Sequence, residues 1–298
     1  MANLWIHGIT LHGKDKQQEM RIIVESSSAK AVWALVEGEE IIESVSTEGI
    51  NPFFLSRRDI SHTIRLGLPE SFFKRRWEHV NIYCSGCTTE EKKKIVEASA
   101  VAQFKTPVTV ESNLLGAARG SLNDRSGIVC ILGTGSNSCQ YDGSRIVKQV
   151  RSLGFILGDE GSGSSLGKIF VSDCLKGLAP QEISSLFYDR YKVTPDEIMD
   201  EVYITNSPNK WLNDYAVFLA ENMGNEYVNT LVKNELKRFF ERNILQYDYT
   251  DYPVSFVGEV ACLYSDVIKE IASEMGVEVS DIKELSLPGL VKYHAMHE

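Results

Sequence analysis

Short apolar runs and longer amphipathic stretches alternate along the first 120 residues. Three runs rich in β-branched residues are separated by polar or glycine-containing turns, a spacing that predicts an antiparallel meander. Longer segments with helical periodicity and further buried runs follow. The elements expected in this half are strands at 21–24, 31–36, 41–45, 80–83 and 108–110, and helices at 60–66, at 90–104 and from 114 onward.

The helix expected at 90–104 has a clear start signal. Thr88 or Thr89 can cap its N-terminus with a hydroxyl oxygen. The spacing of its apolar residues predicts a shared buried face, and the residues expected on it are Ile95, Ala98, Val101 and Ala102.

The second half is richer in helical patterns. It opens on a strand at 128–132 with a Gly133-Thr134-Gly135 turn. Helical patterns fill 162–245, and a strand at 252–257 precedes helices at 261–275 and 288–296. Because each half pairs strands with crossover helices, the chain is expected to have an α/β fold.

Composition narrows the class of protein. The 298 residues carry 31 basic and 41 acidic side chains, a net charge of −10 that argues against a nucleic-acid surface. Apolar runs are too short to span a membrane, and six cysteines without an export signal favour a cytoplasmic protein with reduced thiols. Residues 1–19 are expected to form a polar tail, with Met20 as the functional start.

The segment 127–138 carries the first candidate chemistry. It is a buried strand that runs into Gly133-Thr134-Gly135-Ser136. Glycines let backbone N–H groups approach an anion, and hydroxyls add donors, so the turn fits a phosphate site. A plain β-hairpin explains the same residues equally well.

A second candidate is the acidic, glycine-rich segment 154–167. Asp159 and Glu160 lie between glycines directly before a helix. They could bind sugar hydroxyls or hold Mg²⁺ through water, or they could simply stabilise a helix N-terminus. The spacing of Lys168 and the glycines before it excludes a Walker A loop.

Two weaker motifs complete the set. Cys84-Ser85-Gly86-Cys87 could be a redox pair or half a zinc site, but no second pair exists and a strand-to-turn role is favoured. Gly258 stands between a strand and a helix, where a flat ring or ribose could approach the backbone.

Taken together and in this order, these segments resemble the BadF/BadG/BcrA/BcrD ATPase family, and within it the N-acetylglucosamine kinase-like proteins. The resemblance runs from Met20 nearly to the end and includes Gly49-Ile50-Asn51-Pro52-Phe53 and Leu114-Leu115-Gly116-Ala117-Ala118-Arg119. It implies a two-domain actin/hexokinase-like (ribonuclease H-like) α/β fold with a central cleft. The implied domains are 20–117, joined by the C-terminal helix 287–298, and 118–286.

The resemblance also implies ligands. They are ATP, Mg²⁺ and an amino sugar. The implied reaction is phosphoryl transfer to a sugar hydroxyl. A homodimer and a monomer both stay open. The residues it assigns to the sugar are Asn51, Asn137, Gly154 and Asp159. The residues it assigns to the nucleotide are Ser28, Lys30, Thr134, Gly135 and Gly258. Glu25 and Glu160 are assigned to Mg²⁺, indirectly.

The first phosphate loop departs from the family pattern. It reads Glu25-Ser26-Ser27-Ser28-Ala29-Lys30-Ala31. Ser27 stands where a glycine is usual, so its Cβ restricts the backbone, and Ala29 and Ala31 lack the hydroxyl donors. Lys30 could still attract phosphate.

The catalytic position departs as well. The family places an Asp before the Leu-Leu-Gly-Ala helix, and this chain has Asn113. An Asn can orient the attacking hydroxyl but cannot take its proton. Loss of a positioned base costs about 10²–10⁴-fold in rate. Glu111 is a distant surrogate on the same strand face.

Three functions therefore remain open. The first is an active sugar kinase of the N-acetylglucosamine kinase type. The second is a catalytically impaired relative that binds nucleotide or sugar as a sensor or regulator. The third is an ATPase activator of a dehydratase, which would need interface cysteines for an iron–sulfur cluster and offers only Cys84 and Cys87 as a close pair.

Overall fold

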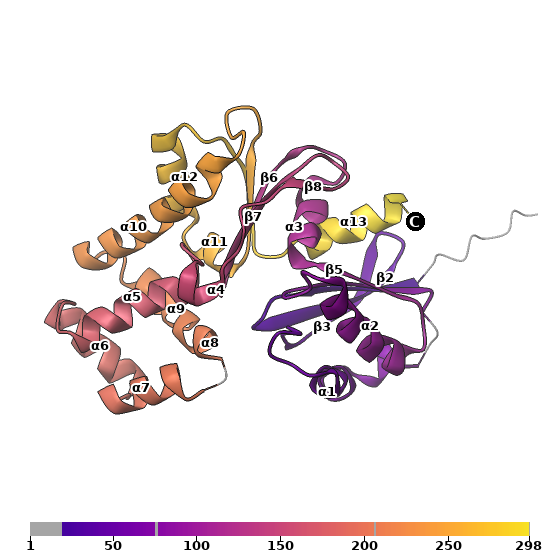
Figure 1. Cartoon of the computed structure of the whole chain (residues 1–298), viewed down its shortest axis with the longest axis horizontal. Helices are drawn as coiled ribbons and strands as arrows, with labels where there is room; N and C mark the ends of the chain where they lie inside the picture. Colours follow the sequence, from indigo (N-terminus) through magenta and orange to yellow (C-terminus); the bar gives the residue numbers. More distant parts are fainter. Residues whose placement is uncertain (1–19, 75–76, 206, 298) are drawn as a thin grey trace, which may run out of the picture.

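The computed structural model describes residues 20–74, 77–205 and 207–297. Its described residues form two halves side by side, each built on a five-stranded mixed sheet (Figure 1). The predicted tail, residues 1–19, lies outside the described residues. Among the residues that the structure describes, no helix has the length and apolar character needed to cross a bilayer.

The first sheet has the strand order β3-β2-β1-β4-β5. Strands β1, β4 and β5 are parallel, and β2 is antiparallel to both its neighbours. The expected meander is thereby confirmed as β1-β2-β3. The strands are β1 (Met20–Ser26), β2 (Lys30–Glu37), β3 (Glu40–Glu48), β4 (His79–Cys84) and β5 (Val108–Ser112). The helices of this half are α1 (Arg57–Gly67), a 3-10 turn (Glu70–Phe72), α2 (Glu90–Phe104) and α3 (Asn113–Leu122).

The second sheet repeats this topology. Its order is β10-β9-β6-β7-β8, with β6, β9 and β10 parallel and β7 antiparallel to β6 and β8. The matching order and direction of the strands show that the two halves share one plan. The strands are β6 (Gly127–Leu132), β7 (Ser136–Tyr141), β8 (Ile146–Lys148), β9 (Val254–Val257) and β10 (Val279–Lys283).

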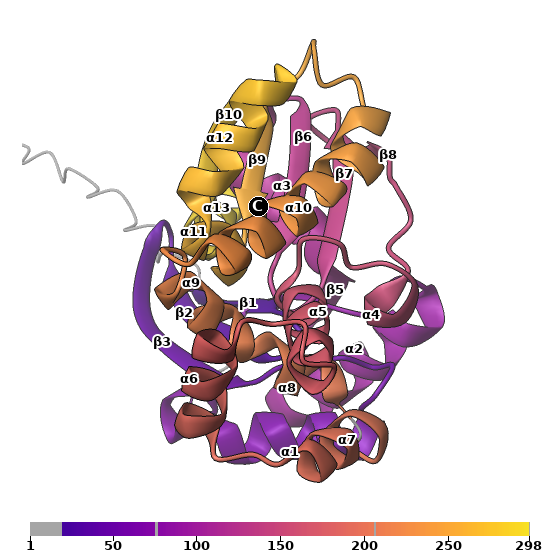
Figure 2. The ribbon, with the colours of Figure 1, turned by 90° about the vertical axis from the view of Figure 1, so that its left-hand side faces the viewer.

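Helices cover both faces of the second sheet (Figure 2). Alternate residues of β6 face opposite sides: Ile128 and Cys130 join the large core with α5, α10 and α12, whereas Val129 packs toward α3. The remaining helices are α4 (Gly154–Leu157), α5 (Gly163–Leu175), α6 (Gln181–Tyr191), α7 (Pro195–Tyr203), α8 (Pro208–Asn213), α9 (Tyr215–Glu221), α10 (Glu226–Arg242), a 3-10 turn (Ile244–Gln246), α11 (Glu259–Leu263), α12 (Ser265–Met275) and α13 (Leu287–His297).

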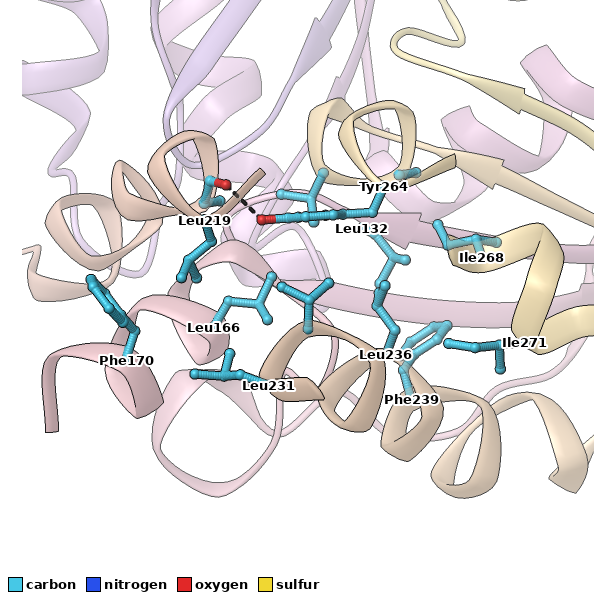
Figure 3. Packing of buried hydrophobic residues seen from close by; sticks show 14 of the residues in the cluster. Leu132, Leu166, Phe170, Leu219, Leu231, Leu236, Phe239, Tyr264, Ile268 and Ile271 are labelled. Carbon is cyan, nitrogen blue, oxygen red and sulfur yellow. Dashed lines mark hydrogen bonds between the residues drawn. The ribbon is translucent and has the colours of Figure 1, made fainter. Parts of the chain in front are cut away.

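The large core of the second half joins α5, α9, α10 and α12 to the sheet (Figure 3). Tyrosine hydroxyls in this core are hydrogen-bonded: the Tyr264 hydroxyl, for example, donates to the carbonyl of Ala216 at 2.6 Å. Tyr264 also separates α11 from α12, where the sequence predicted one continuous helix.

Helix α2 confirms its predicted bounds and cap but not its predicted buried face. Thr89 accepts the backbone N–H of Lys92 at 3.3 Å. The face predicted from Ile95, Ala98, Val101 and Ala102 is wrong, since Val101 is 40% exposed and Ala102 is also exposed. The buried stripe starts one residue later, with four-residue spacing that ends on the large ring of Phe104, and comprises Val96, Ala100 and Phe104.

Helices α3 and α13 link the two halves. They cross where side chains are absent: a Cβ on Gly289 would lie 1.8 Å from the carbonyl oxygen of Gly120. Helix α13 also packs its apolar residues on β1 and β2 of the first sheet. The predicted domain boundary between residues 117 and 118 falls inside α3.

Candidate functional site

The Gly133-Thr134-Gly135 turn connects β6 to β7 and is held from behind by α5. The backbone N–H of Gly163 donates to the carbonyl of Gly133 at 2.9 Å, and that of Ser164 donates to the carbonyl of Thr134 at 3.3 Å. Strand β7 pairs with β6, so the segment 127–138 forms the β-hairpin that was one of its two expected roles. The turn nevertheless lies at the carboxyl end of β6, where ligands bind in α/β sheets.

Asp159 lies directly over this turn. Its Oδ1 accepts the backbone N–H of Ser136 at 3.2 Å, and a Cβ on Gly135 would come within 2.9 Å of its Oδ2. The missing side chain at 135 therefore makes room for the carboxylate. The pKa of Asp159 is raised to about 6, chiefly because the carboxylate is buried. The nearby charge of Glu160 also raises this pKa, whereas the hydrogen bond from the Ser136 N–H and the charge of Lys168 lower it.

Gly258 reaches the same turn from β9. It adopts φ 130, and a Cβ there would lie 2.1 Å from the carbonyl oxygen of Leu132. Only glycine permits this approach. The structure thus brings together Thr134, Gly135, Asp159 and Gly258, four of the residues singled out in the sequence.

Asn137 and Gly154 lie along the edge of this cluster. The Oδ1 of Asn137 accepts the backbone N–H of Ser138 at 2.9 Å and the side-chain amide of Gln149 at 3.1 Å. Gly154 starts α4 with φ 73 and is exposed. The Ser152 hydroxyl donates to the carbonyl of Ser136 at 3.3 Å, which ties this segment to β7.

The first loop, between β1 and β2, satisfies its own amides. The Ser27 hydroxyl accepts the backbone N–H groups of Ala29 at 3.1 Å and Lys30 at 3.0 Å. These donors would otherwise be available to an anion. The side chain of Lys30 is exposed. The effect of Ser27 on the loop therefore includes these two hydrogen bonds, in addition to the backbone restriction expected from its Cβ.

A continuous set of contacts runs across the carboxyl ends of β1, β4 and β5. The Nδ2 of Asn51 donates to the Oγ of Ser28 at 2.8 Å, and the Oδ1 of Asn51 accepts the N–H of Phe53 at 3.0 Å. Gly86 has φ 76, and a Cβ there would meet the Oδ1 of Asn51 at 2.2 Å. Beside it, the Ser85 hydroxyl accepts from Asn113.

Asn113 is the first residue of α3, and its Nδ2 donates to the Oγ of Ser85 at 3.0 Å. The surrogate carboxylate considered for its role is engaged elsewhere: Glu111 pairs with Lys93 on α2 at 2.8 Å. The structure therefore groups Ser28, Asn51 and Asn113 on the first sheet, and places the Asp159 cluster on the second.

The two carboxylates assigned to Mg²⁺ make structural contacts. Glu25 accepts from the N–H and hydroxyl of Ser286 at 3.1 and 2.9 Å and from the N–H of Leu287 at 2.7 Å, at the start of α13. Burial raises the pKa of Glu25, and these donors oppose the rise. Glu160 pairs with Arg242 at 2.5 Å. Neither arrangement conflicts with a metal that is bound through water.

The C-x-x-C pair is buried beneath the loop 49–53. The sulfur atoms of Cys84 and Cys87 lie 3.3 Å apart, and the Cys84 thiol donates to the carbonyl of Ile50 at 3.4 Å. The hydrogen bond to Cys87 and burial raise the pKa of the Cys84 thiol well above its usual range. Both thiols are almost inaccessible, which disfavours an iron–sulfur cluster shared at a subunit interface.

Sequence reasoning missed a buried carboxylate that binds the segment directly after Asp159. Glu235 on α10 accepts from the N–H of Gly161 and the hydroxyl of Ser165, and it pairs with Arg238. One signal was present: Glu235 interrupts an apolar stripe with four-residue spacing between Leu231 and Phe239. A charge at such a position is the informative exception in a buried face.

Comparison with solved structures identifies relatives over nearly the whole chain. The crystal structure of the "putative N-acetylglucosamine kinase" of Porphyromonas gingivalis has a TM-score of 0.89 and 33% sequence identity, and the match covers 93% of this chain and 99% of the other. The chain belongs to the family of that protein. No protein-family model matches it, and no curated protein sequence does.

More distant structures establish the fold class. The "putative N-acetylglucosamine kinase" of Chromobacterium violaceum has a TM-score of 0.70 at 14% identity over 93% of this chain and 99% of the other. A ROK family glucokinase from Streptomyces griseus, in complex with glucose and AMPPNP, has a TM-score of 0.55 at 14% identity over 93% and 98%. The predicted two-domain actin/hexokinase-like α/β fold is confirmed.

Proposed function

We propose that this protein is an ATP-dependent sugar kinase of the N-acetylglucosamine kinase type within the BadF/BadG/BcrA/BcrD ATPase family. The observation that carries the proposal is the placement of Asp159 over the β6–β7 turn, beside Gly258, in a chain 33% identical to the Porphyromonas gingivalis protein described above. A glycine turn supplies donors for phosphates, and a partly buried carboxylate accepts sugar hydroxyls.

Residues at both sheets would contact the ligands. Thr134, Gly135 and Gly258 would line the nucleotide, and Asp159 would bind a sugar hydroxyl next to it. On the other sheet, Asn51 would bind the sugar and Asn113 would orient the attacking hydroxyl. Phosphoryl transfer depends mainly on such positioning and on electrostatic stabilisation of the phosphates.

Mg²⁺ is proposed to accompany the nucleotide. Mg²⁺ keeps several waters and binds through substrate phosphates with one or two carboxylates. Glu25 and Glu160 are the carboxylates proposed to contact the metal through water, while each keeps its protein partner. When bound, the metal would neutralise charge on the transferred phosphate.

An impaired nucleotide- or sugar-binding relative is the second candidate function. Two observations favour it: Asn113 cannot accept a proton, and the Ser27 hydroxyl occupies two amides of the first loop. Such a protein would still bind ligand through the intact cluster around Asp159.

One experiment separates the two functions. ADP formation from Mg-ATP is measured with a panel of amino sugars and hexoses, and binding of AMPPNP and N-acetylglucosamine is measured by calorimetry. Turnover near 1 s⁻¹ or above, the lower end of typical enzymes, would support the kinase. Binding without turnover would support the impaired relative, and neither binding nor turnover would contradict both.

A further inference from the structure

A buried carboxylate on α10 lies behind the Asp159 cluster. Glu235 is 1% exposed and is one of the buried residues of α10, together with Leu231, Leu236 and Phe239. Figure 3 shows these three apolar side chains in the core. Burying an uncompensated charge in an apolar core costs several kcal/mol. The contacts of Glu235 must therefore supply the compensation.

Three donors satisfy the Glu235 carboxylate. Its Oε1 accepts the backbone N–H of Gly161 at 3.3 Å and the hydroxyl of Ser165 at 2.6 Å. Its Oε2 accepts from Arg238 at 2.8 Å. The first two donors belong to the segment between Asp159 and the first turn of α5, so one side chain ties α10 to that segment.

The segment it holds has an unusual backbone. Asp159 and Gly161 both adopt left-handed conformations, with φ 57 and φ 73. A non-glycine residue there costs on the order of 1 kcal/mol and persists only when its surroundings enforce it. Helix α10 contacts this segment at three points: Glu235 binds Gly161, Arg242 binds Glu160, and Phe239 packs on Gly161. A Cβ added to Gly161 would lie 2.9 Å from the Cβ of Phe239.

We propose that Glu235 is a positioning residue that fixes the Asp159 carboxylate over the β6–β7 turn and thereby sets sugar affinity. The inference rests on the proposed sugar kinase function for its kinetic consequence. Its structural consequence, an ordered segment from residue 158 to residue 166, is independent of any activity.

The surroundings of Glu235 make a clean test feasible. A surface cavity of about 760 Å³ between α5 and α10 is lined by both Glu235 and Arg238, and the Arg238 side chain is 51% exposed. Removing the glutamate therefore leaves Arg238 in contact with water. Glu235→Gln keeps an acceptor oxygen for Gly161 and Ser165, whereas Glu235→Met has similar length and no acceptor.

The first measurement is hydrogen exchange of amides 158–166 in the ligand-free protein. Hydrogen bonds to a charged group contribute about 1.5–3 kcal/mol, so Glu235→Met should exchange there at least about tenfold faster. Glu235→Gln should stay within about threefold of wild type, and the control Glu241→Met, on the exposed face of α10, should match wild type. Unchanged exchange in a folded Glu235→Met variant would overturn the proposal. If that variant does not fold, Ser165→Ala takes its place.

The second measurement is steady-state kinetics with Mg-ATP and the sugar. We expect the KM for the sugar to rise about tenfold in Glu235→Met while the KM for ATP stays within about twofold, with rescue in Glu235→Gln. If the KM for the sugar and the KM for ATP changed equally in Glu235→Met, or if Glu235→Gln did not restore the KM for the sugar, Glu235 would have a merely structural role. A wild-type protein without turnover would contradict the proposed kinase function. The hydrogen-exchange experiment would still test whether Glu235 positions the segment.

Discussion

The side-chain amide of Asn113 donates to the hydroxyl of Ser85 at 3.0 Å, at the point where α3 begins. Ser85 follows the carboxyl end of β4, so the contact joins two neighbouring parallel strands of the first sheet. A hydroxyl can donate as well as accept. The same geometry can therefore hold a carboxylate at position 113, with the hydrogen bond reversed.

Replacing Asn113 with Asp should produce a folded and faster enzyme. The new carboxylate would accept from Ser85 and would lie at the N-terminus of α3, where negative charge stabilises a helix by about 0.3–1 kcal/mol. As a general base it should raise kcat by about 10²–10⁴-fold. ADP formation with the sugar measures this, with Asn113→Ala as the control that removes the side chain. A wild type already in the ordinary enzyme range and no slower than the Asp variant would show that the amide is compensated.

Removing the Ser27 hydroxyl should improve nucleotide binding. Ser27→Ala would release the N–H groups of Ala29 and Lys30, which could then meet a phosphate. A hydrogen bond contributes about 1 kcal/mol, so the Kd for AMPPNP should fall about three- to tenfold for each amide that meets the phosphate. Calorimetry measures the Kd, and Ser44→Ala on β3 provides a control. Weaker binding in Ser27→Ala would mean that the hydroxyl itself contacts the nucleotide.

The sequence predicted the elements whose apolar pattern is strong. The β-branched runs of β1 to β3 and the cap of α2 at Thr89 are local signals, and the structure confirms both. Strand β7 was expected only under the β-hairpin alternative for 127–138, because its Ser-Asn-Ser-Cys-Gln-Tyr sequence is polar. It forms through pairing with β6 and through contacts such as the 2.9 Å hydrogen bond between Ser138 and Tyr247, which lie far apart in the chain.

The residues of the candidate site also differ in how well the sequence predicts them, according to whether their partners are near or distant in the chain. Glycine and carboxylate motifs near one another in sequence located Thr134, Gly135 and Asp159, and the structure brings them together. Contacts between distant segments had no local signal. The Ser165 hydroxyl meets Glu235 across 70 residues, and Glu25 meets Leu287 across 262. The family resemblance assigned Glu25 to Mg²⁺, and nothing local in the sequence reveals that Glu25 also binds the start of α13.

Removing the Glu25 carboxylate should destabilise the link between the two halves. Glu25→Ala would leave the N–H groups of Ser286 and Leu287 without their acceptor at the start of α13, at a cost of about 2–4 kcal/mol. Glu25→Gln keeps one acceptor oxygen and should lose about half of that. Urea unfolding measures the free energies, and Glu37→Ala at the end of β2 is the control. A folded Glu25→Gln variant whose stability is unchanged but whose Mg²⁺ requirement is altered would instead support the metal role.

The ionised carboxylate of Asp159 should lower the stability of the fold while it serves sugar binding. Its pKa, raised by burial to about 6 from an ordinary 3.8, means that the folded state binds the proton more tightly than the unfolded state. Ionised Asp159 therefore destabilises the fold: its protonation stabilises the protein below pH 4, and that contribution is lost as pH rises to about 6. A shift of this size corresponds to at most about 3 kcal/mol.

Asp159→Asn should therefore unfold at a higher temperature than wild type at pH 7.5, with the difference vanishing near pH 4. The amide oxygen can still accept the N–H of Ser136, so the turn is preserved. Sugar binding should weaken at least about tenfold, because hydrogen bonds to the charged form are stronger. In wild type, the KM for the sugar should rise as pH falls through about 6, and in Asp159→Asn it should not. Thermal melts and sugar titrations across pH 4–8 measure both effects. A variant that is less stable at pH 7.5 would show that the contacts of Asp159 outweigh its burial.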